Sequence, residues 1–263
     1  NVKLSDYLDI DGVDGEFRGD FDIEGPLLSP MIDGAFFSDG NIDQDNYNMT
    51  GDFSYEDSKI HLRTTGDIDT GYVNSVIDYN LANDGIDVEL DMGQIPVASF
   101  NNFVDDIEIY EGVLGGDISL HGSLDTPEIG GVIKFDDGLI YVPFTGITYF
   151  NCNANLKGKG DHIELSTFRV RCRYQGRDNG KISGNGTYYF DNSGKFHLDL
   201  DKFYIIEDPQ ISLSLTGILD GTIGENISVH GNLDVFRGIV NIKRDTFLDN
   251  ASLQIDPRIN FHH

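Results

Sequence analysis

The residues best suited to chemistry in this chain are histidines, cysteines and a large excess of acidic residues. Catalysis by such groups needs a nucleophile beside a base, a metal-binding cluster or paired acids in a cleft. His121 and His230 hold the same position in two similar segments, and Glu24 holds it in a third. A position that accepts either residue type is typical of a solvated outer surface, so these residues are not assigned a catalytic role.

The remaining histidines and glycine-rich segments lead to the same interpretation. His61, His162 and His197 lie on the polar side of alternating segments. The run from Gly180 to Gly186 is glycine-rich, but no helix is expected after it to present backbone amides to a phosphate. We therefore predict that the protein is not an enzyme and uses no cofactor.

Cys152 and Cys172 are the only two cysteines, and both fall in alternating apolar segments. Cys152 is in phase with Phe150 and Leu156, and Cys172 is in phase with Val170. Two inward cysteines are compatible with a disulfide in an oxidising compartment or with two buried thiols. Their spacing does not decide between these alternatives, and it does not match a zinc site.

The charge of the chain excludes some partners. Its 18 Lys and Arg face 45 Asp and Glu, a net charge of −27. Such a surface repels nucleic acid and argues against flat docking on an anionic membrane. Most of the acid alternates with apolar residues, as on a solvated strand face. The run from Asp9 to Asp14 leaves weak calcium binding open as an alternative, although it lacks the closing glutamate of a calcium hand.

Period-two alternation of apolar and polar residues runs through nearly the whole chain and predicts 16–18 mostly antiparallel strands. Ile86, Val88, Leu90 and Met92, for example, alternate with acidic residues. One segment, Ile95 to Val104, has helical spacing with Pro96 at its start, and predicts one short helix.

An eleven-residue pattern occurs three times, from Gly15 to Gly25, from Gly112 to Gly122 and from Gly221 to Gly231. We interpret each copy as a strand that ends at glycine. Strands of this kind cannot bury their apolar faces alone, so we expect them to share one long sheet. No composition shift divides the chain, so we predict a single elongated domain over residues 1–261, with modules near 10–95, 96–215 and 216–261.

The alternation is one-sided, so the apolar face must be covered, wound inward or curled into a trough. Equivalent apolar residues in the three copies favour the trough. The predicted fold is thus all-β: a long, curved, mostly antiparallel sheet forming a half-pipe with an apolar groove. The residues expected to line the groove are Phe17, Phe21, Ile23, Met49, Phe53, Val88, Leu90, Leu114, Ile118, Leu120, Phe150, Leu156, Val170, Ile182, Tyr188, Phe190, Leu198, Leu213, Ile223, Ile227 and Val229.

No run of 18 apolar residues predicts a membrane-spanning helix, and no signal peptide opens the chain. Asn1 is therefore expected to be an internal start, and His262 and His263 to be a tag remnant.

The second module has a recognisable order of motifs. The helix near Pro96 leads to the strand from Gly112 to Gly122, then to a spacer with Pro127 and Gly130, then to Asp137-Gly138 and a long strand. This order resembles the TamB family, of the AsmA-like bridge-type lipid transfer proteins, and the resemblance extends over about residues 10–260.

The resemblance implies a half-pipe known as a β-taco, in the periplasm of a diderm bacterium. It also implies an inner-membrane anchor through an amino-terminal helix outside this chain, an outer-membrane β-barrel partner of the Omp85 type (TamA-like), and transport of phospholipid. From the residues alone, the leading hypothesis is a conduit that shields phospholipid acyl chains. The alternatives are a structural or adhesive β-solenoid and a scaffold for assembly of outer-membrane β-barrels.

Overall fold

The structure, a computed structural model, is a single antiparallel sheet of fifteen strands that pair strictly in chain order. It describes residues 2–3, 13–26, 29–43, 45–104, 106–174, 177–207 and 210–240. The predicted all-β class is confirmed. The described residues contain fifteen of the 16–18 expected strands, and the Asp9–Asp14 run lies mostly outside them.

The strands are long, and most contain 12 or more residues. In the amino-terminal half they are β1 Val2–Lys3, β2 Val13–Glu24, β3 Met31–Ile42, β4 Asp45–Glu56, β5 Lys59–Ile68, β6 Gly71–Asn80 and β7 Gly85–Pro96. In the carboxyl-terminal half they are β8 Glu108–Ser123, β9 Thr126–Val142, β10 Ile147–Gly158, β11 His162–Tyr174, β12 Arg177–Tyr189, β13 Gly194–Glu207, β14 Ile211–Ile223 and β15 Ser228–Val240.

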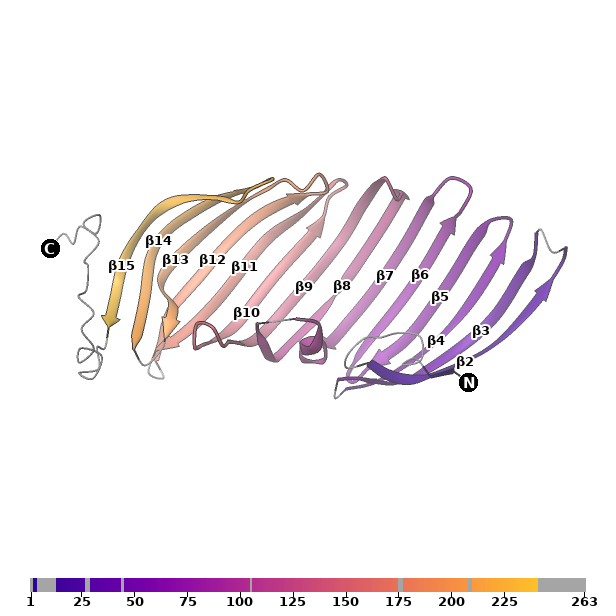
Figure 1. Cartoon of the computed structure of the whole chain (residues 1–263), viewed down its shortest axis with the longest axis horizontal. Coiled ribbons are helices and arrows are strands. Elements are labelled where there is room, and N and C mark those ends of the chain that lie inside the picture. Colours follow the sequence, from indigo (N-terminus) through magenta and orange to yellow (C-terminus); the bar gives the residue numbers. More distant parts are fainter. Residues whose placement is uncertain are drawn as a thin grey trace, which may run out of the picture.

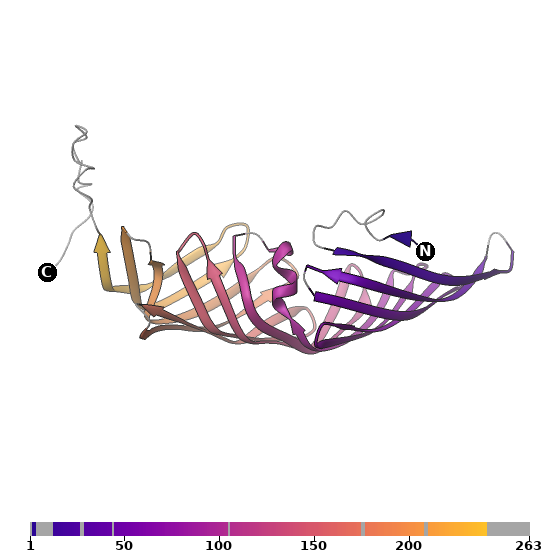
Figure 2. The same cartoon turned by 90° about the horizontal axis from the view of Figure 1, so that it is seen from below.

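The sheet is curved into a trough (Figures 1 and 2). Figure 1 shows the strands side by side along the long axis, and Figure 2 shows both ends and one long edge rising toward the same side. We call the concave side the inner face and the convex side the outer face. Successive side chains on a strand alternate between these two faces.

Short polar turns join the strands, and residues with positive φ mark where the chain turns or bulges. Asp57 and Ser58 join β4 to β5, and Asp84 precedes β7. Gln94, Asn151 and Lys202 also have positive φ, and each lies inside a strand where the register shifts. Such bulges bend a sheet and increase its twist, so they contribute to the curvature of the trough.

The predicted short helix is confirmed as a 3₁₀ helix, η2, over Val97–Phe103. Pro96 precedes it with φ of −65°, so this proline lies where its missing N–H is not needed. The Asn101 side chain accepts a hydrogen bond from the Ile109 backbone N–H and donates one to the Ile109 carbonyl, at 2.7 Å each. These bonds fix the helix against the start of β8.

The third copy of the repeat is not a strand, contrary to the sequence-based interpretation. Gly221–Ile223 ends β14, residues 224–227 form a turn, and β15 begins at Ser228. Gly25 and Gly122 have positive φ at the ends of β2 and β8, whereas Gly231 lies within β15 without this conformation. The Gly-Glu-Asn sequence at 224–226 favours a turn, and this local preference outweighs the resemblance to the other copies.

Candidate functional site

The candidate site is the inner face of the trough. One register row can be followed on this face through fourteen strands, from β2 to β15. The row consists of Phe17, Ser38, Met49, Gly66, Val73, Met92, Gly116, Ile133, Leu156, Leu165, Gly186, Phe196, Gly221 and Val229. With strands about 4.8 Å apart, it forms an apolar track about 60 Å long.

Glycines in this face accommodate the aromatic side chains of neighbouring strands. The Phe36 ring lies over Gly51, where an added Cβ would come within 2.4 Å of it, and the Phe196 ring covers Gly221 in the same way. A ring that covers glycine buries part of its area against the sheet.

The structure places most of the residues expected to line the groove on the inner face, by alternation and by register. These residues are Phe17, Phe21, Ile23, Met49, Phe53, Val88, Leu90, Leu114, Ile118, Leu120, Leu156, Val170, Ile182, Tyr188, Leu198, Leu213, Ile223 and Val229.

Three of the expected lining residues lie elsewhere. Phe150 is on the outer face, because the bulge at Asn151 (φ 47°) reverses the alternation between Tyr149 and Cys152. There the Phe150 ring lies 4.2 Å from the Arg173 guanidinium carbon. Phe190 and Ile227 lie in turns after β12 and before β15, because polar turn residues end the alternation before it reaches them.

The inner face is sealed only along one long edge. We call the edge where β3, β5, β7, β9, β11 and β13 end the closed rim, and the opposite edge the open rim. Near the closed rim lie Tyr47, Ile68 and Ile95, which pack with Phe100 of η2. Further along it, Ile147, Cys172 and Tyr204 are at most 1% exposed. These two clusters are the apolar cores of the described residues.

The end of β13 completes the closed rim by crossing over β11. The Tyr204 backbone N–H donates to Cys172 Sγ at 3.3 Å, and the Glu207 N–H donates to the Thr145 carbonyl at 2.7 Å. The rings of Phe203 and Tyr149 stack with their centroids 5.3 Å apart. The bulge at Lys202 bends β13, and the bend allows the end of this strand to pass over β11.

Apolar side chains are exposed at both rims, but among the described residues the buried clusters lie only near the closed rim, where Phe144 and Tyr110 are among the exposed exceptions. The open rim has exposed apolar residues without such a cluster. Ile23 at the end of β2 and Ile227 in the β14–β15 turn are each 70% exposed. Leu81, Leu124 and Phe190, in three further turns of this edge, are also exposed. Between the rims, residues such as Val88, Ile118 and Leu156 are half-buried. The inner face is thus a half-pipe, with one sealed wall and one open apolar edge.

Both cysteines lie in the closed-rim core as thiols, so the structure has the buried-thiol alternative and not the disulfide. Burial raises the pKa of the Cys152 thiol to about 11. Burial also raises the pKa of the neighbouring Tyr149 hydroxyl. A neutral buried thiol acts as a small apolar side chain and is a poor nucleophile.

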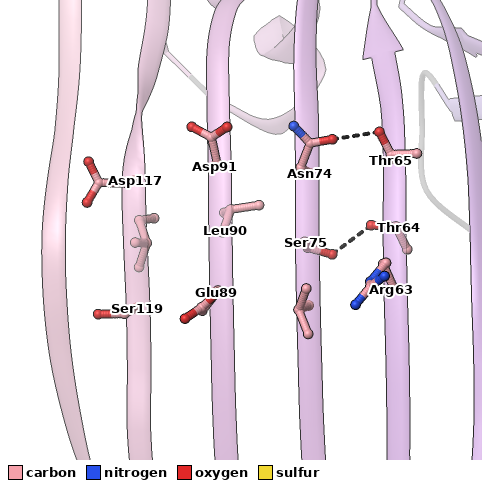
Figure 3. Close-up of a pocket in the computed structure, with 12 residues that line it drawn as sticks. Arg63, Thr64, Thr65, Asn74, Ser75, Glu89, Leu90, Asp91, Asp117 and Ser119 are labelled. Atoms are coloured by element: carbon pink, nitrogen blue, oxygen red, sulfur yellow. Dashed lines mark hydrogen bonds between the residues drawn. The ribbon is translucent and has the colours of Figure 1, made fainter.

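The outer face is polar, and cross-strand pairs organise it. His61, His121 and His197 contact Asp78, Asp87 and Asp220 across neighbouring strands, at 2.7–3.0 Å. Glu89, Asp91 and Asp117 line a hollow of about 410 Å³ on β5–β8 (Figure 3), where Thr65 donates a hydrogen bond to Asn74. The hydrogen bond between Thr64 and Ser75 lies on the inner face instead, because these residues are in phase with Gly66 and Val73. Within the described part of the chain, no three His, Cys, Asp or Glu side chains form a metal-binding group.

Comparison with protein-family models, curated proteins and solved structures finds no match. The conclusions about this chain therefore depend on its own geometry. Among the described residues, no helix has both the length and the apolar character needed to span a bilayer.

The inner face can bind a long apolar molecule through burial of apolar surface alone. It provides a long surface of half-buried aliphatic and aromatic side chains, with polar groups on the opposite face. Sequence reasoning missed the difference between the two rims. Period-two alternation assigns a side chain to a face, but it contains no information on which edge of the sheet will be covered.

Proposed function

We propose that this chain is a segment of a lipid conduit, in which acyl chains lie along the inner face of the trough. The observation that carries the proposal is the fourteen-strand apolar row between a sealed rim and an open one. Such a face leaves a continuous row of half-buried apolar side chains in contact with water, and contiguous apolar patches usually mark binding sites. An occupant that buries it is therefore strongly favoured.

Acyl chains fit this surface in both chemistry and shape. Burial of each CH₂ group contributes about 0.8 kcal/mol, so two chains are held without a dedicated headgroup site. The headgroup stays in water at the open rim, where the wall is not sealed. Because the grip is distributed along repeated rows, a lipid can move by one strand spacing without losing most of its contacts.

The wider setting of the proposal comes from the resemblance to the TamB family. In this proposal the chain lies in the periplasm, belongs to a protein anchored in the inner membrane and works with an outer-membrane β-barrel partner. Phospholipid then passes between the two membranes along the trough. The alternative of a β-solenoid with a filled interior fits less well, because the described strands form a single layer.

Mass spectrometry of lipid extracted from the purified protein tests the proposal. We expect phospholipid to co-purify with the chain, and the Ile118→Asp variant to retain much less of it. Ile118 is a half-buried residue on the inner face, so a carboxylate there remains partly hydrated and the fold persists.

The matched control is Ile147→Asp, at a closed-rim residue that is 1% exposed. A charge there has no access to water, so this variant should lose its folded structure, as measured by circular dichroism and thermal melting. If Ile118→Asp unfolds as completely as the control, or binds as much lipid as the unmodified chain, the inner face is not an acyl-chain groove.

A further inference from the structure

Contrary to the expectation that no composition shift divides the chain, the charge of the molecule is distributed very unevenly along its length. Residues 1–128 contain 4 Lys and Arg against 29 Asp and Glu, a net of −25, whereas residues 129–263 contain 14 against 16, a net of −2. Residues 147–189, which include β10, β11 and β12, contain seven Lys and Arg against three Asp and Glu. A strongly acidic chain thus carries one locally basic region.

The basic side chains of this region share the outer face. Arg169 and Arg171 alternate on β11 beside Lys181 and Ser183 of β12, and together with Asn153 of β10 they line a hollow of about 450 Å³. Arg173 continues the row and stacks on Phe150. Acidic residues border this region. Asp199 and Asp201 lie on β13, with Asp201 3.7 Å from the Lys181 ammonium. Asp178 is opposite Arg173 in the ladder, and the Asp137 backbone N–H donates to the Asn153 side chain. We call Arg169, Arg171, Arg173 and Lys181 the basic patch.

An exposed aromatic residue lies at the closed rim, in the turn that leads into β10. Phe144 is in the turn between β9 and β10 and is 88% exposed, the most exposed large apolar residue of the described chain. The turn is fixed, because the Thr145 and Gly146 N–H groups both donate to the Val142 carbonyl at 3.0 Å, and Glu207 donates to Thr145. Phe144 is therefore presented to solvent by a well-held loop.

We propose that the basic patch and Phe144 form a docking corner for an anionic lipid bilayer. Arginine and lysine side chains near an anionic membrane surface are attracted to its headgroups, and an aromatic tip inserts at the interface. The acidic half of the molecule is repelled by the same surface. The contact is therefore confined to the corner near β10–β12, and the long axis is tilted away from the membrane plane.

The observations favour a bilayer over a second copy of this chain as the partner. The acidic outer face of another molecule would complement the basic patch, but two molecules of net charge −27 repel each other as wholes. The basic patch is on the outer face and Phe144 is in a turn of the closed rim, so the proposal does not depend on what occupies the trough.

Vesicle co-sedimentation tests the proposal with the full chain. We expect binding to phosphatidylcholine vesicles containing 30% phosphatidylglycerol, little binding to pure phosphatidylcholine, and weaker binding in 0.5 M NaCl. The Arg169→Gln/Arg171→Gln variant should bind about 10- to 30-fold more weakly. The control variant Arg18→Gln/Arg63→Gln removes the same charge from exposed arginines in the acidic half and should bind like the unmodified chain.

A fluorescent probe tests the orientation independently, since the chain contains no tryptophan. The emission of Phe144→Trp should shift to the blue with the anionic vesicles, and that of Phe190→Trp, in an open-rim turn, should not. Equal binding by the two arginine variants, binding that is indifferent to phosphatidylglycerol, or a shift at Phe190 alone would overturn the proposal. So would a dimer seen without vesicles that the Arg169→Gln/Arg171→Gln change dissociates.

Discussion

At the scale of single residues, the inner face depends on small side chains as much as on large ones. Gly51 and Gly221 lie under aromatic rings, and the rings fit there because these positions have no Cβ. The cysteines are a second case. Cys152 and Cys172 fill space in the closed-rim core, and their chemistry is suppressed by the burial that makes them useful there.

The thiol of Cys152 should react slowly in the folded protein. At pH 8, a thiol with a pKa of about 11 in place of 9.0 is ionised about 100-fold less, so iodoacetamide should label it at a correspondingly reduced rate. Peptide mapping by mass spectrometry, with and without urea, measures the difference. Rapid labelling of Cys152 in the folded state would show that the closed rim opens readily.

The raised pKa of Cys152 also has a consequence for stability. The unfolded chain ionises near pH 9 and the folded chain only near pH 11, so the contribution of this thiol is complete below pH 9. It is lost as the pH rises from 9 to about 11. Urea unfolding across this range should show a smaller decline for Cys152→Ala, with Tyr149 responsible for part of what remains.

At the scale of elements, the two rims have different roles: the closed rim contains the buried cores, and the open rim leaves the inner face accessible. The end of β13, the start of β10 and helix η2 enclose the apolar cores, whereas the turns of the open rim leave leucine, isoleucine and phenylalanine in water. Regions with few sealed contacts open more easily than the core. The open rim is therefore expected to open more easily than the closed rim.

Substitutions at the two rims should differ in their energetic cost. Phe203→Ala removes a buried ring that stacks on Tyr149 and should lower the free energy of unfolding by about 3–5 kcal/mol. Phe21→Ala, at a residue 44% exposed near the open rim, should cost about 1 kcal/mol. Urea denaturation measures both. Similar costs would mean that the crossing of β13 over β11 contributes little.

Much of this architecture could be predicted from the sequence, because alternation is a local signal. Segments such as Ile86 to Met92 indicate both a strand and its apolar face, and Pro96 indicates the helix. The bulge at Asn151 has no comparable signal, so Phe150 was assigned to the wrong face. The hydrogen bond between Glu207 and Thr145 joins residues far apart in the chain, and no local pattern encodes it.

At the scale of the whole molecule, like charges face each other over the acidic half. Asp22 is paired with Asp33, and Asp91 with Asp117, each directly across neighbouring strands. Acidic side chains in such positions repel and destabilise a sheet. The outer face of β2–β8 therefore favours solubility at a cost in stability.

Salt should stabilise the molecule for this reason. Raising NaCl from 20 mM to 500 mM shortens the screening length from about 20 Å to about 4 Å, so the thermal midpoint should rise by several degrees. The Asp33→Lys variant replaces one repulsive pair with an attractive one and should reduce this dependence. A midpoint that is independent of salt would contradict the interpretation.

The strict meander has a consequence for how such a molecule changes in length. Every strand pairs only with its neighbours in the chain. The pairing of one strand therefore does not depend on the total number of strands in the sheet. Outside the closed-rim contacts of β10–β13, insertion or loss of one hairpin adds or removes about 10 Å and preserves the inner face and both rims. Loss of a single strand would instead exchange the rims for every later strand. The length of the molecule can thus change in steps of one hairpin while its cross-section stays the same.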